Sequence, residues 1–81
     1  MGGRVELPPD MEDFRLYIGD FDQTAVKQFN CHAGMREKCA TYGLDWWGFL
    51  TNGIMFSELQ ALEDGQVNRC LVEIINGRRR K

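Results

Sequence analysis

Apolar residues recur along this chain at the three- and four-residue spacing that places side chains on one side of a helix. The clearest example is Met35, Cys39 and Tyr42, between which the charged residues point mainly to other sides. The pattern predicts a mainly α fold, a small bundle of four to five short helices. The expected helices cover residues 22–29, 33–42, 46–52, 57–63 and 66–76.

Glycine and aspartate mark the ends of these helices. Gly43, Gly53 and Gly77 follow three of the apolar segments, and glycine accepts the left-handed conformation in which many helices end. Asp45 and Asp64 precede two others, where a carboxylate can accept hydrogen bonds from free backbone amides. Each helix is therefore expected to be short and to stop at a defined residue.

The segment 66–76 is ambiguous because its run RCLVEII is rich in the branched residues typical of strands. Val67, Cys70, Leu71 and Ile74 nevertheless fall at i, i+3, i+4 and i+7. We therefore predict a helix here, with a strand over 67–75 as the alternative.

The first nineteen residues are expected to form an extended N-terminal arm, because Pro8 and Pro9 block a helix. The alternation of Phe14, Leu16 and Ile18 favours a single β-strand over 14–18 with no identified partner in this chain. Such a strand would pack on the helices as an irregular arm or pair with a neighbouring subunit. A helix opened by Asp10 is the competing interpretation. The expected organisation is an arm (1–19), a compact helical domain (20–77) and a basic C-terminal tail (78–81).

Composition and residue spacing disfavour several classes of functional site in this chain. The net charge is −2, but four basic residues end the chain, so residues 1–77 carry six basic against twelve acidic groups. Three cysteines without a CxxC pair and one histidine give no standard zinc spacing and no catalytic triad, and no glycine-rich phosphate loop is present. No apolar run approaches the roughly 18 to 20 residues of a membrane span. We expect no enzyme activity, cofactor, metal site or membrane partner.

The two adjacent tryptophans are expected to have different roles, since neighbouring helical side chains point about 100° apart. Trp46 shares a side with Phe49 and Leu50 and is the core candidate. Trp47 points elsewhere and is the first candidate for an interface anchor, because large exposed aromatic residues are typical of binding hot spots. The secondary interface candidates are Phe14, Tyr17, Met55 and Phe56.

The run GLDWxxFLxxGI, Gly43 to Ile54, together with Cys31-x-x-Gly34-x-Arg36 and the Val/Leu-rich C-terminal segment, resembles a family of small proteins encoded among the virion-morphogenesis genes of tailed bacteriophages and prophages. The resemblance covers about residues 18–76. It implies a structural or adaptor protein of the virion, in the tail, its distal end or the neck, made in the host bacterial cytoplasm. The implied partners are other phage structural proteins, and self-association in a symmetric ring is a further expectation.

Two other functions fit parts of the sequence. Helices over 22–29 and 33–42 have the proportions of a helix-turn-helix DNA-binding motif, in which Arg36 and Lys38 would enter a groove. The basic tail, Arg78, Arg79, Arg80 and Lys81, would contact phosphates or an acidic protein surface. The acidic body repels a phosphate backbone, which disfavours nucleic acid as the partner. A phage-encoded inhibitor of a host protein is the third hypothesis.

Overall fold

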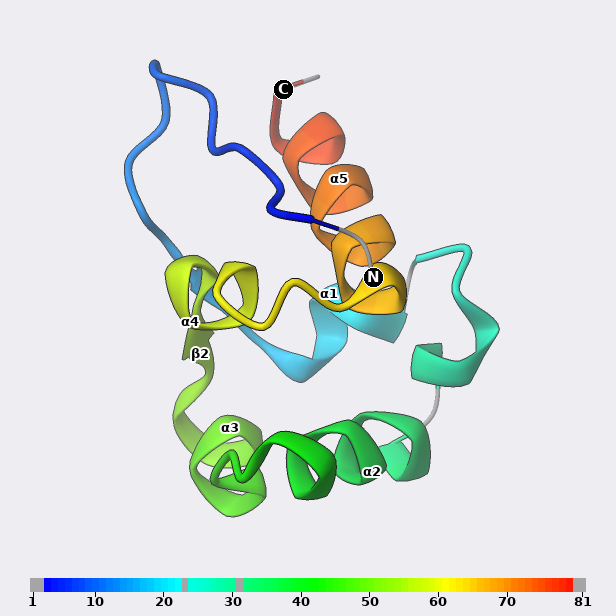
Figure 1. Cartoon of the computed structure of the whole chain (residues 1–81). Helices are drawn as coiled ribbons and strands as arrows, with labels where there is room; N and C mark the ends of the chain where they lie inside the picture. Colours follow the sequence, from blue (N-terminus) through cyan, green and yellow to red (C-terminus); the bar gives the residue numbers. More distant parts are fainter. Residues whose placement is uncertain (1–2, 23, 31, 80–81) are drawn as a thin grey trace.

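The computed structural model describes residues 3–22, 24–30 and 32–79 (Figure 1). Within these ranges the chain forms five α-helices, one 3-10 helix and a two-stranded ribbon, which confirms the predicted mainly α fold. The elements are β1 (Arg15–Leu16), α1 (Ile18–Asp22), η1 (Lys27–Asn30), α2 (His32–Tyr42), α3 (Trp46–Asn52), β2 (Ile54–Met55), α4 (Phe56–Gln60) and α5 (Gly65–Arg79).

Helices α2 and α3 agree with the predicted ranges, and Gly43 separates them in the left-handed region at φ 68°. Asp45 is the residue before α3, but its carboxylate makes no capping hydrogen bond, contrary to the prediction. The carboxylate instead lies beside Gly48, where an added Cβ would meet Asp45 Oδ2 at 2.5 Å. The first turn of α3 is closed by the backbone alone, through the Phe49 amide and the Asp45 carbonyl, 3.0 Å apart.

The predicted helix over 22–29 is wrong. Helix α1 ends at Asp22, and the 3-10 helix η1 begins only at Lys27. The Ala25 amide donates to both carboxylate oxygens of Glu73 in α5, at 3.0 Å each, and the Thr24 hydroxyl donates to the Phe21 carbonyl. These tertiary and local side-chain bonds take the backbone groups that a continuous helix would have used.

The strand near residue 14 exists, but its partner lies within the same chain. Arg15 and Leu16 of β1 pair in antiparallel register with Met55 and Ile54 of β2. This pairing corrects the expectation of a strand without a partner in this chain. The pairing also brings together the two ends of the segment that contains α1, α2 and α3. Both β1 and the start of α1 lie inside residues 1–19, the range expected for the extended arm.

Gly53 allows β1 to approach the end of α3 closely enough to pair with β2. It ends α3, as predicted, with φ 81° and ψ −177°, a backbone conformation that is almost restricted to glycine. A Cβ at this position would lie 2.6 Å from the Leu16 carbonyl oxygen and 2.9 Å from the side chains of Arg15 and Tyr17. The strand β1 therefore passes directly over the position where Gly53 has no side chain.

Helix α4 is shorter than the predicted 57–63, because Glu63 has a positive φ of 51° and interrupts the chain. The prediction of a helix over 66–76 is confirmed by α5, and the strand alternative is excluded. The predicted stop at Gly77 is wrong, since α5 continues to Arg79. A glycine inside a helix costs about 1 kcal/mol relative to alanine but does not end the helix.

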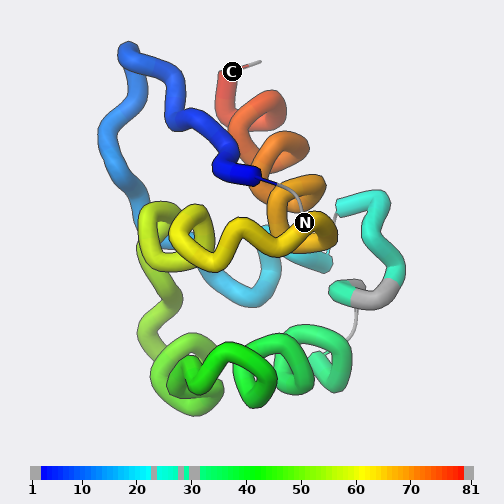
Figure 2. The backbone as a smooth tube through the Cα atoms, in the orientation of Figure 1, coloured from blue at the N-terminus to red at the C-terminus, as the bar shows by residue number. Residues whose placement is uncertain are grey.

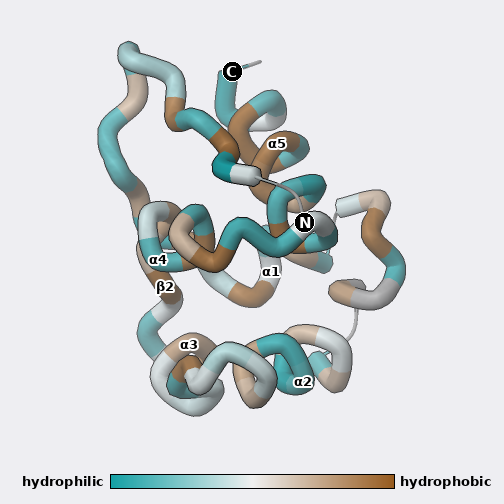
Figure 3. Tube along the Cα trace, in the orientation of Figure 1, coloured by the Kyte–Doolittle hydropathy of each residue, from teal (hydrophilic) through white to brown (hydrophobic). Residues whose placement is uncertain are grey.

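The core lies where α1 sits between the α2/α3 pair and α5 (Figure 1). Phe21 of α1 and Phe49 of α3 meet edge to face with ring centroids 5.8 Å apart, and Thr24 approaches Cys70 of α5. Brown, apolar positions of α5 alternate with teal ones around the helix (Figure 3). The buried apolar residues are Leu16, Phe21, Val26, Phe29, Met35, Cys39, Phe49, Ile54, Phe56, Leu59, Val67, Cys70, Leu71 and Ile75.

Candidate docking surface on helices α2 and α3

The two tryptophans at the start of α3 have different environments. Trp46 is half-buried and meets both Phe49 and His32 edge to face, with centroids 6.1 Å apart in each pair. Trp47 keeps 69% of its surface exposed. The predicted exposure of Trp47 is confirmed, whereas the core residue of α3 is Phe49, with Trp46 at the edge of the core.

A groove of about 550 Å³ lies beside Trp46 between α2 and α3. We call it the α2/α3 groove, and it is lined by His32, Ala33, Arg36, Glu37, Ala40, Trp46 and Leu50. Its walls are mainly apolar, and the exposed Arg36 and Glu37 supply its charge. Within the described residues, neither of these two charged side chains forms an ion pair. The groove therefore combines apolar contact area with one charge of each sign for a partner.

The sequence pattern predicted Arg36 as a contact residue but did not indicate that His32, Ala33 and Ala40 lie on the same surface. Ala33, Arg36 and Ala40 fall at i, i+3 and i+7, on the side of α2 opposite the buried Met35. The two small side chains, Ala33 and Ala40, are a signal in the sequence for a helix side that another element can approach. The contribution of α3 to the groove depends on the tertiary packing of Trp46, which the spacing alone does not give.

The secondary interface candidates lie in other places. Tyr17 is 53% exposed, and Met55 is half-buried. Phe56 is fully buried, so its prediction as an interface residue is wrong. The α4 helix begins at Phe56 and turns this side chain into the core.

Phe14 is half-buried and makes internal contacts on both sides. Its ring lies 5.3 Å from the Phe56 ring, and the Arg78 guanidinium lies 4.0 Å from its centroid, as in a cation–π pair. Arg78 is thus held against its own chain. Arg79 is exposed at the end of α5, and the predicted contacts of Arg80 and Lys81 fall outside the described residues.

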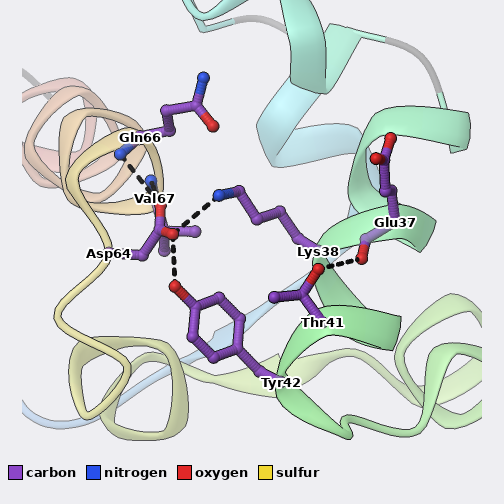
Figure 4. Close-up of polar contacts among 7 residues, drawn as sticks. All are labelled: Glu37, Lys38, Thr41, Tyr42, Asp64, Gln66 and Val67. Carbon is purple, nitrogen blue, oxygen red and sulfur yellow. Dashed lines mark hydrogen bonds and ion pairs between the residues drawn. The ribbon is translucent and has the colours of Figure 1, made fainter.

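Lys38 does not point into solvent as a DNA-contacting residue would. Its ammonium group lies 2.7 Å from Asp64 Oδ2, and the Tyr42 hydroxyl donates to the same oxygen at 2.6 Å (Figure 4). Lys38 is held against the start of α5, and the described residues 24–29 contain the start of the 3-10 helix η1 but no α-helix, so the predicted helix-turn-helix geometry is wrong.

The Asp64 carboxylate is at the centre of this cluster. Its Oδ1 accepts hydrogen bonds from the backbone amides of Gln66 and Val67, each 3.0 Å away, as predicted for a helix cap. Partial burial raises the pKa of Asp64, but the hydrogen bonds from Lys38, Tyr42 and Val67 outweigh it and lower the pKa to about 2. The hydrogen bond to Asp64 also raises the pKa of Tyr42. The cluster connects α2 to the start of α5 and has a structural role.

The described cysteines lack the features of reactive thiols. Burial raises the pKa of Cys39 and Cys70, and a nucleophilic cysteine requires the opposite shift. Among the residues that the structure describes, no three His, Cys, Asp or Glu side chains are grouped to hold a metal ion. In the same ranges, no helix is both long enough and apolar enough to cross a bilayer.

Comparisons with models of known protein families, with curated protein sequences and with solved structures found no match for this chain. Support for a function therefore comes from the surface itself and from the resemblance in the sequence.

Proposed function

We propose that this protein is a non-enzymatic structural or adaptor component of a tailed bacteriophage particle, in the tail, its distal end or the neck. It acts by docking onto other virion proteins. The role in a phage rests on the GLDWxxFLxxGI resemblance, and the docking mechanism rests on the surface of α2 and α3.

The observation that supports docking best is the exposure of Trp47. An indole ring with 69% of its surface in water offers a large apolar area that a partner can bury on docking. Tryptophan is also among the residues most enriched at binding hot spots. The partner is expected to bury Trp47 and to place an apolar side chain in the neighbouring α2/α3 groove.

The charged residues of the groove give the partner a recognisable chemistry. Arg36 and Glu37 have no ion-pair partner among the described residues, so a docked protein can offer one carboxylate and one cation to them. Such a pair at the rim of an interface contributes more to orientation and specificity than to affinity.

The direct test is incorporation of the Trp47→Ala variant into phage particles. We expect the variant to keep the melting temperature of the wild type, because Trp47 contributes little to the core, and to be absent from purified particles analysed by mass spectrometry. Val72→Ala is the matched control, since Val72 is another exposed apolar residue, 45% exposed, on α5. The control is expected in particles at the wild-type level.

Two results would contradict the proposal. Detection of the wild-type chain in infected-cell extracts but never in purified particles would exclude a retained structural role. Normal incorporation of Trp47→Ala would exclude Trp47 as the docking residue.

A further inference from the structure

The N-terminal residues 3–8, here called the arm segment, lie against α4 and α5 of the same chain. Gln60 Nε2 of α4 donates a hydrogen bond to the Val5 carbonyl, and Asn68 Nδ2 of α5 donates to the Gly3 carbonyl, each at 2.7 Å. Val5 and Leu7 are half-buried against the core. We call Gln60, Asn68 and the apolar residues beneath the arm segment the arm-binding surface.

A single turn connects the arm segment to the rest of the protein. The Met11 amide donates to the Pro8 carbonyl at 2.9 Å, and residues 9–10 at the apex of this turn are exposed. Just after the turn the chain is fixed again, because Asp13 accepts hydrogen bonds from the Ser57 amide and hydroxyl. Figure 2 shows the arm folding back on itself at this turn, which stands away from the helices. The turn therefore has the position of a hinge.

One polar atom of the arm-binding surface has no hydrogen-bond partner among the residues that the structure describes. Asn68 is only 6% exposed, and its Oδ1 accepts no hydrogen bond from the described residues. A buried acceptor without a donor weakens the hold of this surface on any arm segment, whether it comes from the same chain or from a second copy. The arm segment is thus held by two side-chain hydrogen bonds and two half-buried apolar residues, against this unfavourable contribution.

We propose that the arm-binding surface also takes the arm segment of a second copy, so that two copies exchange arms about a two-fold axis. The chain is long enough for this exchange. Residues 3–10, when extended, reach about 26 Å at roughly 3.3 Å per residue, whereas the protein measures 31 × 24 × 22 Å. Opening the hinge therefore lets the arm segment reach the arm-binding surface of a copy that lies against this side of the protein.

The choice of a second copy follows from the contacts. The surface already fits residues 3–8 of this chain, and a second copy supplies the same carbonyls and the same apolar side chains. An exchanged pair keeps the contacts of two closed monomers and changes only the hinge. The closed form is then favoured in dilute solution, and exchange is favoured where copies are held close together.

The first experiment shortens the hinge by deleting Pro9 and Asp10, which removes the two central residues of the turn. The arm can then no longer fold back, and we expect light scattering to give twice the molar mass of the monomer. A shortened chain that stays monomeric at the same concentration would overturn the proposal.

Two further substitutions in the shortened chain identify the contact. Val5→Asp places a charge on the half-buried side of the arm and should return the protein to the monomer. Trp47→Ala alters the α2/α3 surface and should leave the dimer intact. A dimer that survives Val5→Asp, or that dissociates with Trp47→Ala, forms through another surface and contradicts arm exchange.

A second measurement uses the hinge at its natural length, in case the shortened chain does not fold. Two full-length chains with different tags carry Val5→Cys and Gln60→Cys respectively, in a background with Cys31→Ser. Refolding them together under mild oxidation should give a disulfide-linked mixed dimer. Arg4→Cys is the matched control for Val5→Cys, because Arg4 is exposed, and it should give little mixed dimer. Equal yields for the two positions would show random collision and overturn the proposal.

This inference goes beyond the docking function and can fail separately from it. Loss of exchange with normal incorporation into particles removes only the arm proposal. Normal exchange with no effect of Trp47→Ala on incorporation removes only the docking proposal.

Discussion

At the scale of single residues, Gly53 has a requirement that the sequence pattern only partly revealed. Its position after α3 predicted a helix stop, and the positive φ confirms it. The sequence did not indicate that β1 lies against Gly53, because Arg15 and Leu16 are far from Gly53 along the chain. Gly53 therefore meets a backbone requirement and a packing requirement together.

We expect Gly53→Ala to lower the free energy of unfolding by about 2 kcal/mol, since the new Cβ faces a nearly glycine-only conformation and the Leu16 carbonyl. Urea denaturation followed by tryptophan fluorescence measures the change. Gly77→Ala is the matched control, because a Cβ there meets nothing within 4 Å inside α5, and it should raise stability by about 0.5 to 1 kcal/mol. Equal effects of the two substitutions would contradict the close approach of β1.

At the scale of the elements, the start of α5 depends on one carboxylate that serves two helices. Asp64 caps α5 through its Oδ1 and holds Lys38 and Tyr42 of α2 through its Oδ2 (Figure 4). The capping role could be predicted from the sequence, since aspartate before an apolar stripe is a typical helix start. The contact with α2 could not, because it depends on how the two helices pack.

This arrangement predicts a loss of stability in acid. The pKa of Asp64 is lowered from 3.8 to about 2 on folding, so the folded protein binds the proton less readily than the unfolded chain. The charged carboxylate stabilises the fold fully above its ordinary pKa of 3.8, and this contribution is lost as the pH falls to about 2. The measurement is the free energy of unfolding in urea across that range.

The control for the acid experiment is Asp64→Asn, which keeps a capping side chain but cannot titrate. The difference in stability between wild type and this variant should shrink as the pH falls through the same window. A difference that stays constant with pH would show that Asp64 ionisation does not contribute.

At the scale of the whole molecule, a thin core holds two groups of helices together through α1. The Phe21 and Phe49 rings form the contact between α1 and α3, and the Ala25–Glu73 and Thr24–Cys70 contacts connect the following segment to α5. An 81-residue domain buries a limited part of its surface, so each buried aromatic ring is a large part of the total stability.

We therefore expect Phe49→Ala to lose about 3 to 5 kcal/mol and to unfold much of the protein at room temperature. Trp46→Ala should cost less, because Trp46 is only half-buried at the edge of the core. Circular dichroism during thermal melting tests this order. If Trp46→Ala proves the more damaging substitution, the assignment of Phe49 as the core residue of α3 is wrong.

The sequence predicted the structural features that depend on neighbouring residues. It did not predict the features that depend on contacts between residues far apart along the chain. Helices α2, α3 and α5 follow apolar stripes with glycine or aspartate at their ends, so their positions could be predicted. The absence of an α-helix over residues 24–26 depends in part on Glu73, almost fifty residues away, and the local spacing of apolar residues does not indicate that contact. For the candidate surface, the exposure of Trp47 could be predicted from helical geometry, whereas the α2/α3 groove required the packing of two helices.

The contribution of α5 to the core also determines when this protein can fold during its synthesis. Val67, Cys70, Leu71 and Ile75 of α5 are all buried in the core. Residues 3–64 therefore leave the ribosome with the apolar sides of α1 and α4 uncovered until α5 follows them. Folding can be completed only after residues 65–79 have left the ribosome, and until then the nascent chain exposes the apolar surface that α5 later covers.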